Sequence, residues 1–454
     1  MSPLMDAQGA WRDYLAVQPD TKAVDLYMPD LTGIVRGKRV TASAFASGLD
    51  DGFPFASSLY SLDTTGANVE STGLVWEEGD PDRLFRPDMA SLRPVPWLDG
   101  TAEVLGGLVE DDGQPFFPDP RAALVRVIGR FAELGLTPCV ALEYEFYLIQ
   151  ATVGPDGAPL PPLDPTTGRP QTETHVFSLD GLEEHRAFLE ALENYARAQR
   201  LPLKGAVAEY APGQYEVNLG HVADPLQAAD HGFVFKRAVK AAARSAGLAA
   251  SFMAKPFPDQ SGNGLHLHVS LLDAQGRNLF GRDEGEARLR HAIGGLRATM
   301  AEAMLVFAPN ANSYRRFRNR SYVPMAPTWG YNNRTVALRI PRGPRDALRV
   351  EHRVAGADAN PYLVLAAVLA GMHHGLTGRL DPGAPITGNA YDQIPASLPV
   401  AWDRAIAAHE AAPILPGYLG ERLWTVYGQC RAGERDRFMD VIHPVEHAWY
   451  LGAV

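Results

Sequence analysis

Acidic residues at alternate positions are the first feature of this sequence that could do chemistry. Glu143 and Glu145 lie in an apolar segment that alternates like a β-strand, so both carboxylates are expected on one face of it. Glu209 and Glu216 flank a Pro-Gly turn, and Glu216 begins a second alternating segment. Each pair alone also fits a solvated strand or an exposed turn, so the interpretation depends on the neighbouring motifs.

Histidine follows glycine at alternate positions in the segment 261–270. Gly262 and Gly264 would let the backbone approach a ligand closely. His266 and His268 share one face of the strand that is expected there. Two imidazoles at this spacing after a glycine loop are uncommon as core residues, so a ligand-binding role is the favoured interpretation.

The segment around residue 351 is dense in charge. Arg349, Glu351 and Arg353 would line one strand face, and three charges are costly to bury unless they are paired or face a ligand. Arg334 and Arg339 frame the preceding strand. Arginine recognises phosphate and carboxylate groups with two parallel hydrogen bonds, so this segment is a candidate anion site.

Together these motifs supply five glutamates, two histidines and a cluster of arginines. Carboxylates with an imidazole suit Mg²⁺ or Mn²⁺ better than zinc. Two such ions can clamp the oxygens of a phosphoryl group during transfer. The sequence contains no Walker A phosphate loop, so a P-loop enzyme is excluded.

In this order and spacing the motifs resemble type I glutamine synthetases over nearly the whole chain. The segments 328–334 and 356–360 are most similar to the γ-glutamylpolyamine and γ-glutamylputrescine synthetases. The other stretches that carry the resemblance are 143–145, 209–216, 255–256, 262–268, 312–316, 333–341 and 349–353 with 360–363.

The resemblance implies specific roles for individual residues. Two or more divalent metals, Mg²⁺ or Mn²⁺, would be held by Glu145, Glu209 and Glu216 and by Glu143, His266 and Glu351. ATP would contact His268, Ser270, Arg339 and Arg349, and glutamate would contact Gly262, Arg316 and Arg353. The residues given catalytic roles are Arg334, which would stabilise the transferred phosphoryl group, Arg316 and Asp63.

The resemblance also implies a two-step reaction in which L-glutamate takes the γ-phosphate of ATP and an amine then displaces phosphate. The implied fold is α+β, with a small N-terminal β-grasp domain at about residues 20–110 within 1–112. A catalytic domain built on an antiparallel sheet with surrounding helices would follow over 113–454. The family's assembly implies a homo-oligomer, a double-ring dodecamer with active sites between subunits.

The sequence departs from glutamine synthetases on the side where ammonium would bind. Leu62-Asp63-Thr64-Thr65-Gly66 replaces the family's Asp-Gly-Ser-Ser, and Met325 replaces a glutamate that takes a proton from ammonium. Methionine offers no charge and leaves apolar room for a carbon substituent. We therefore favour an organic amine, which could be a polyamine, a diamine or a small monoamine. An acid for the far end of a diamine could come from Asp63, Glu70, Glu77 or Glu78.

Two alternatives remain open from the sequence. The first is an authentic glutamine synthetase with an unusual ammonium site, and the second is a non-catalytic paralogue that serves assembly or regulation. Tyr391 falls where some bacterial glutamine synthetases are adenylylated, but an ordinary tyrosine in a surface loop is the favoured interpretation.

The elements that must position these residues come as intermixed strands and helices, which favours an α+β fold. The first hundred residues indicate mainly short strands and turns, followed by a polar loop over 57–81. Strands are expected at 23–28, 33–41, 101–109, 140–149, 214–219, 264–272 and 335–340. Helices are expected at 120–134, 181–199, 225–246, 361–375, 401–411 and 444–451.

Composition narrows the function classes. The net charge is −11, with 42 basic and 53 acidic residues and no extended basic stripe that would suit nucleic acid. The first twenty residues lack a signal-peptide core, and no apolar run reaches membrane-spanning length. Two cysteines, Cys139 and Cys430, cannot form a disulfide framework. We therefore expect a cytoplasmic enzyme with small-molecule substrates.

Overall fold

The first hundred residues build a small sheet in the computed structural model, which describes residues 6–77 and 79–454. Its strands are β1 (Ala23–Pro29), β2 (Val35–Thr41), β3 (Phe53–Ala56), β4 (Asp82–Pro87), β5 (Arg93–Pro94) and β6 (Thr101–Val109). Their order is β2-β1-β6-β4-β3, with β5 also paired to β6. The pair β1–β6 is parallel and the others are antiparallel.

Two helices cover this small sheet that the sequence patterns did not predict. They are α1 (Ala7–Val17) and α2 (Ala42–Gly48). The ring of Trp11 on α1 meets the edge of Phe45 on α2 at 4.9 Å between centroids, and both rings are buried. Since each helix buries only one aromatic residue, neither shows an extended apolar stripe in the sequence.

The rest of the chain is built on a second, larger sheet. Its strands are β7 (Thr137–Gln150), β8 (Leu203–Ala208), β9 (Gln214–Leu219), β10 (Leu248–Ser251), β11 (Leu265–Leu272), β12 (Trp329–Tyr331), β13 (Leu338–Ile340) and β14 (Val350–His352). The order is β12-β13-β14-β11-β7-β9-β8, with β10 also paired to β7. Every pair except β12–β13 is antiparallel, so the expected antiparallel sheet is confirmed.

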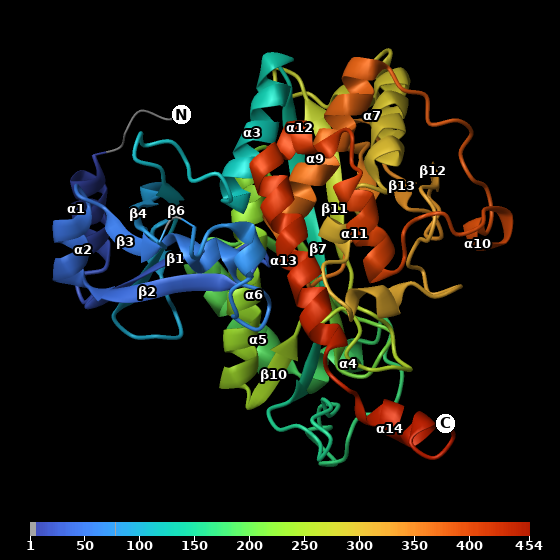
Figure 1. Ribbon diagram of the computed structural model, residues 1–454, viewed down its shortest axis with the longest axis horizontal. Helices are drawn as coiled ribbons and strands as arrows, with labels where there is room; N and C mark the ends of the chain where they lie inside the picture. Colours follow the sequence, from blue (N-terminus) through green and yellow to red (C-terminus); the bar gives the residue numbers. More distant parts are fainter. Residues whose placement is uncertain (1–5, 78) are drawn as a thin grey trace.

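Helices pack around this sheet (Figure 1). They are α3 (Pro120–Glu133), α4 (Leu179–Glu184), α5 (Arg186–Ala198), α6 (Pro225–Ser245), α7 (Gly285–Thr299), α8 (Met304–Phe307), α9 (Pro361–Gly378), α10 (Ala390–Gln393), α11 (Trp402–Glu410), α12 (Leu415–Leu419), α13 (Glu421–Met439) and α14 (Pro444–Tyr450). The single helix expected over 181–199 is two helices, which meet at His185. The strand expected from residue 335 begins only at Leu338.

The helices α7 and α13 were missed because their patterns lack a clear apolar face. In α7, Gly294 and Gly295 lower helix propensity. The structure explains Gly295, because a Cβ there would lie 2.0 Å from the carbonyl oxygen of Gly371 on α9. The glycines therefore mark the close crossing of two helices.

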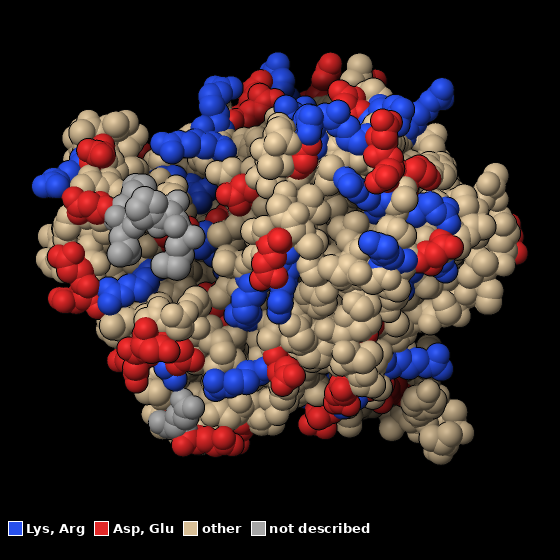
Figure 2. All heavy atoms as spheres, turned by 90° about the horizontal axis from the view of Figure 1, so that it is seen from above, with Lys and Arg blue, Asp and Glu red and all other residues tan. Residues whose placement is uncertain are grey.

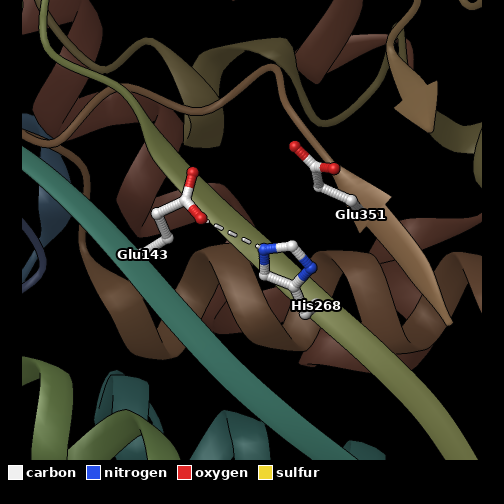
Figure 3. A group of neighbouring side chains, drawn as sticks. All are labelled: Glu143, His268 and Glu351. Carbon is white, nitrogen blue, oxygen red and sulfur yellow. Dashed lines mark hydrogen bonds and ion pairs between the residues drawn. The ribbon is translucent and has the colours of Figure 1, made fainter. Parts of the chain in front are cut away.

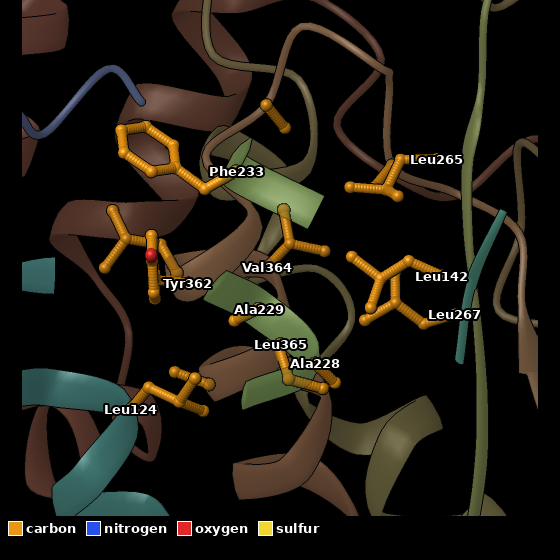
Figure 4. Close-up of a cluster of buried hydrophobic side chains, with 14 of the residues drawn as sticks. Leu124, Leu142, Ala228, Ala229, Phe233, Leu265, Leu267, Tyr362, Val364 and Leu365 are labelled. Atoms are coloured by element: carbon orange, nitrogen blue, oxygen red, sulfur yellow. The ribbon is translucent and has the colours of Figure 1, made fainter. Parts of the chain in front are cut away.

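The helix α9 lies at the centre of the helical layer and is buried along almost its whole length. Figure 4 shows Tyr362, Val364 and Leu365 of α9 clustered with apolar residues of α3, α6 and the sheet: Leu124, Ala228, Ala229, Phe233, Leu142, Leu265 and Leu267. Leu142 alternates with Glu143 along β7, and the same alternation holds along β11. The side of these strands that packs on the helices therefore fixes the opposite side for the polar residues.

The surface is polar and mixed in sign. On the face shown in Figure 2, lysine and arginine side chains are interspersed with aspartate and glutamate. Among the helices of residues 6–77 and 79–454, none is long and apolar enough to span a bilayer.

Candidate active site

A cavity of about 470 Å³ lies over the polar face of the large sheet. Its lining contains all the residues expected to bind metal, which are Glu143, Glu145, Glu209, Glu216, His266 and Glu351. It also contains five of the residues expected to bind glutamate or phosphate, namely Gly262, Arg316, Arg334, Arg339 and Arg353. Segments separated by more than two hundred residues therefore converge on one cavity.

Strand register brings the acidic and imidazole side chains together. Glu143 on β7 pairs with His266 on β11, and Glu145 on β7 pairs with Glu216 on β9. A third pair joins β11 to β14, where His268 lies opposite Glu351. The antiparallel ladder therefore sets the distances between the candidate ligands.

Glu143 is the centre of the polar cluster. One of its carboxylate oxygens lies 2.6 Å from Nδ1 of His266, and the other lies 3.3 Å from Nε2 of His268. Figure 3 shows Glu143, His268 and Glu351 projecting from three adjacent strands on one face of the sheet. The side chain of Glu143 can therefore be shared between two groups of ligands.

Among residues 6–77 and 79–454, three groups of candidate side chains have ligand atoms within 4.8 Å of one another. One is Glu145, Glu209 and Glu216, the set that the sequence assigned to the first metal. The second predicted set is divided in the structure, because Glu143 groups with Glu216 and His266 and separately with His268 and Glu351. His268 is thus a further candidate ligand, besides its expected contact with ATP.

Burial and mutual repulsion shift the pKa values of the carboxylates in this cavity. Burial, together with Glu143 and Glu145, raises the pKa of Glu216 to about 9. Burial and the neighbouring Glu145 raise the pKa of Glu209 to about 7. For Glu143 burial acts in the same direction, but hydrogen bonds with His266 and His268 outweigh it and lower the pKa well below its usual value.

Such crowding of carboxylates is relieved by a cation with a high charge. The available donors are carboxylate oxygens and imidazole nitrogens, the set that Mg²⁺ and Mn²⁺ accept. The donor set therefore fits divalent ions of this kind.

Arginines surround the acidic cluster. Arg339 donates a hydrogen bond of 2.7 Å to Glu351, and Arg353 donates to the other oxygen of the same carboxylate. Arg316 is buried and donates to the carbonyl of Val354 at 3.2 Å, and burial lowers its pKa. The Nε atoms of Arg316, Arg339 and Arg353 have no hydrogen-bond partner within the described ranges. These buried donors can serve an anionic ligand.

The loop at Gly262 passes tightly over Arg316. A Cβ on Gly262 would lie 2.7 Å from Cγ of Arg316 and 2.8 Å from the carbonyl oxygen of Ala254. The carbonyl of Gly262 accepts a hydrogen bond of 3.0 Å from the amide of Gln214. Only glycine fits this approach, which brings backbone groups beside the buried guanidinium.

The remaining candidate contacts for ATP continue along β11, outside the 470 Å³ cavity. Nε of Arg349 donates to Nδ1 of His268 at 3.2 Å, and Ser270 is buried on β11, opposite Cys139. The ring of His221 lies 6.2 Å from that of His268. The sequence does not single out His221, because one histidine after Gly220 forms no motif of its own.

Three aromatic residues at the cavity mouth were also missed. Phe177, Tyr210 and Tyr322 line the cavity and are 73%, 57% and 61% exposed. Phe177 and Tyr322 both have φ of 58°, a strained value for residues with a side chain. Strain and exposure of aromatic residues at a cavity are the signals of function here, and neither can be seen in sequence.

Asp63 lies away from this cavity within the protomer. Its carboxylate is buried and accepts hydrogen bonds from the backbone of Thr65 and Ala67, and it also pairs with Arg437 on α13. Burial would raise the pKa of Asp63, but the Thr65 and Ala67 hydrogen bonds and the charge of Arg437 lower it overall. The side chain ties residues 63–67 to α13, and its expected catalytic role stays a prediction.

Met325 also lies apart from the carboxylates of the 470 Å³ cavity, and so do the loop acids Glu70 and Glu77. Met325 lines a separate cavity of about 260 Å³ with Tyr391 and Ile394. Glu70 accepts a hydrogen bond from the indole of Trp76 at 3.1 Å. Neither Glu70 nor Glu77 lines the 470 Å³ cavity, and Glu78 lies outside the described residues.

Comparisons with known proteins identify the family. Residues 117–450 match the model of the glutamine synthetase catalytic domain. The chain is 40% identical to the γ-glutamylputrescine synthetase PuuA of Escherichia coli (strain K12), over 96% of this chain and 93% of that protein. It is 34% identical to a glutamate–isopropylamine ligase of Pseudomonas sp, over 85% and 84% of the two chains.

A solved structure shows that the fold of this chain is also shared. The structure described as "Apo GmaS without ligand" superposes with a TM-score of 0.83 at 30% identity and covers 100% of both chains. The chain therefore belongs to the glutamine synthetase family of ATP-dependent carbon–nitrogen ligases.

Proposed function

We propose that this enzyme joins the γ-carboxylate of L-glutamate to an organic amine, with γ-glutamyl phosphate as the intermediate. The observation that carries the proposal is the cavity in which metal-type carboxylates meet the buried cations Arg316 and Arg353. The relatives named for an organic amine, putrescine or isopropylamine, support the choice of acceptor.

Each group of residues has a part in this reaction. Arg316, Arg353 and the backbone at Gly262 would hold glutamate, because they place buried donors beside the acidic cluster. Arg334 and Arg339 would stabilise charge on the phosphoryl group, and such fixed donors act most strongly in a partly dry cavity. The nucleotide would lie along β11 and contact His268, Ser270, Arg339 and Arg349.

The divalent ions, Mg²⁺ or Mn²⁺, would be held by the carboxylates of β7, β9 and β14 together with Glu209 and His266. When bound, they would neutralise phosphate oxygens and favour transfer of the γ-phosphoryl group from ATP to the glutamate carboxylate, with ADP as the leaving group. The chain contributes the orientation of glutamate toward that group, because Arg316 lines the same cavity as Glu145 and Glu209.

We also propose that the chain divides near residue 112 and assembles as a double-ring dodecamer with active sites between subunits. The two separate sheets support the division. The C-terminal segment supports assembly, because it exposes apolar side chains: Met439, Ile442, Trp449 and Leu451. Figure 1 shows α14 at the edge of the molecule, away from both sheets.

The test is phosphate release from ATP and L-glutamate with Mg²⁺, comparing ammonium with putrescine, spermidine, ethanolamine, isopropylamine and methylamine. Turnover with an organic amine well above that with ammonium would support the proposal and identify the acceptor. Turnover with ammonium alone would establish a glutamine synthetase instead. Silence with every amine in folded protein would contradict ligase function.

A further inference from the structure

Residues 388–398, which precede α11, make hydrogen bonds to a loop that contributes to the lining of the catalytic cavity. We name residues 388–398 the clasp and residues 320–327 the flap. The hydroxyl of Tyr391 in the clasp donates a hydrogen bond of 3.0 Å to the carbonyl of Val323 in the flap. The carbonyl of Met325 accepts from the backbone amides of Ser397 at 2.9 Å and Leu398 at 3.0 Å.

The gripped part of the flap lines the catalytic cavity. Ser321, Tyr322 and Val323 all contribute to the lining that contains the candidate metal ligands. Arg320 and Tyr322 both have φ of 58°, a conformation that persists only when its surroundings hold it. The one ion pair between flap and clasp, Arg320 with Asp392, is exposed and contributes little. The hydrogen bonds from the Tyr391 hydroxyl and from the backbone amides of Ser397 and Leu398 therefore do most of the holding.

The clasp also holds the turn that carries Arg334. The side-chain amide of Asn333 donates to the carbonyl of Gly388 at 2.8 Å. The backbone amide of Ala390 donates to the hydroxyl of Thr335 at 3.0 Å. Arg334 lies between these two anchored residues and lines the catalytic cavity. One segment thus positions both the flap and the candidate phosphoryl-stabilising arginine.

The hydroxyl of Tyr391 is suited to donate this hydrogen bond to Val323 over the whole neutral pH range. It is half-buried, and burial raises its pKa to about 12, so the hydroxyl stays a donor at neutral pH. Its ring shares the 260 Å³ cavity with Met325 and Ile394. Met325 therefore faces a cavity that the clasp also lines, where an apolar residue favours a closed flap.

We propose that Tyr391 is a positioning residue that holds the flap closed as the solvent-facing wall of the catalytic cavity. The proposal rests on the proposed ligation of glutamate to an amine. A closed wall keeps water from γ-glutamyl phosphate until the amine attacks. When the wall opens, water adds to the acyl carbon, the C–O bond to phosphate breaks, and glutamate and inorganic phosphate leave without amide.

The experiment compares the Tyr391→Phe and Tyr418→Phe enzymes with wild type. Tyr418 is the matched control, because it is also half-buried and its hydroxyl is hydrogen-bonded to Nδ1 of His373 at 2.9 Å. The readouts are the ratio of amide to ADP, the KM values for amine and ATP, and incorporation of ¹⁸O from labelled water into the product glutamate and phosphate.

For Tyr391→Phe we expect the ratio of amide to ADP to fall and the KM for the amine to rise by about 2–10-fold, the effect of one lost hydrogen bond. The KM for ATP should not change, and ¹⁸O should appear in glutamate, whereas the phosphate released in the first turnover should stay unlabelled. Tyr418→Phe should behave as wild type. A Thr335→Val variant, which removes the acceptor for the Ala390 amide, should raise uncoupled phosphate release in the same direction.

A Tyr391→Phe enzyme with wild-type coupling and wild-type KM for the amine would overturn the proposal. The same holds if both tyrosine variants lose coupling equally, because the effect would then be general loosening. Failure of the proposed function is seen separately, since wild type itself would then form no amide with any amine.

Discussion

Glu143 lies opposite His266 in the antiparallel register of β7 and β11, and their polar atoms are 2.6 Å apart. This pair joins a carboxylate and an imidazole from segments more than a hundred residues apart. Because Glu143 belongs to two of the three groups of candidate ligands, its loss should disturb both metal positions at once.

Glu143→Gln should reduce ligase activity by about 100-fold or more, since even groups that only orient a metal ligand contribute 10–100-fold. The shift in thermal unfolding temperature that Mg²⁺ produces in wild type should shrink at the same time. Glu133→Gln, a change on the exposed end of α3, is the control. Equal Mg²⁺ stabilisation of wild type and Glu143→Gln would show that the ion binds elsewhere.

Metal affinity should rise with pH. The pKa of Glu216 is raised to about 9 and that of Glu209 to about 7, so the metal-free site holds protons that the ion must displace. Between pH 7 and 9 the apparent affinity for Mg²⁺ should increase about tenfold per pH unit, with release of about one proton. Calorimetry in buffers of different ionisation enthalpy measures that proton. Glu216→Gln should abolish the release; an unchanged release in this variant would assign it to another group.

Gly262→Ala should raise the KM for glutamate by about tenfold or more, because the new Cβ cannot avoid both Arg316 and the carbonyl of Ala254. The KM for ATP should stay near the wild-type value. Gly129→Ala is the control, since a Cβ on that glycine of α3 has no atom within 4 Å and alanine favours a helix. A normal KM for glutamate in Gly262→Ala would remove this loop from the glutamate site.

Met325→Ala should raise the KM for all accepted amines by a similar factor, because Met325 lines the cavity that it shares with the clasp and does not line the catalytic cavity. The stability loss should be smaller than the roughly 2–5 kcal/mol of a fully buried site, since Met325 is only half-buried. Steady-state kinetics with several amines provides the measurement. A changed order of preference among the amines would show direct contact with the acceptor.

Acid should destabilise the protein partly through His409, which is buried and stacked on Trp424 at 3.8 Å. Its Nε2 bonds the carbonyl of Trp424 at 2.8 Å, and Nδ1 has no partner in the described part of the chain. Burial lowers the pKa of His409 to about 4. The unfolded chain therefore binds a proton near pH 6.5 that the folded chain refuses until about pH 4.

Stability should fall as the pH drops through this window, by about 3 kcal/mol from this group. Urea unfolding between pH 4 and 7 measures the slope, and His409→Phe should flatten it by that amount. Parallel slopes in the two proteins would show that His409 titrates normally.

The sequence by itself determined the chemistry of the site and the faces on which it lies. The alternation of Leu142 with Glu143 placed the acid on the face opposite the core, because strand side chains alternate. The alternate spacing of the glycines and histidines in 262–268 predicted that this segment binds a ligand. The start of a helix is also set by neighbouring residues. At α9 the side chain of Asn360 caps the first turn, and Pro361 fits the first helical position.

Only the tertiary structure decided which of these residues meet. Strand register, which is a property of two segments together, grouped His268 as well as His266 with Glu143. The tertiary structure also pairs the buried carboxylate of Asp63 with Arg437 on α13 and places Met325 at the cavity that the clasp also lines. The hold of Tyr391 on Val323 spans 68 residues, and no local pattern predicts a hydrogen bond between a side chain and a distant carbonyl.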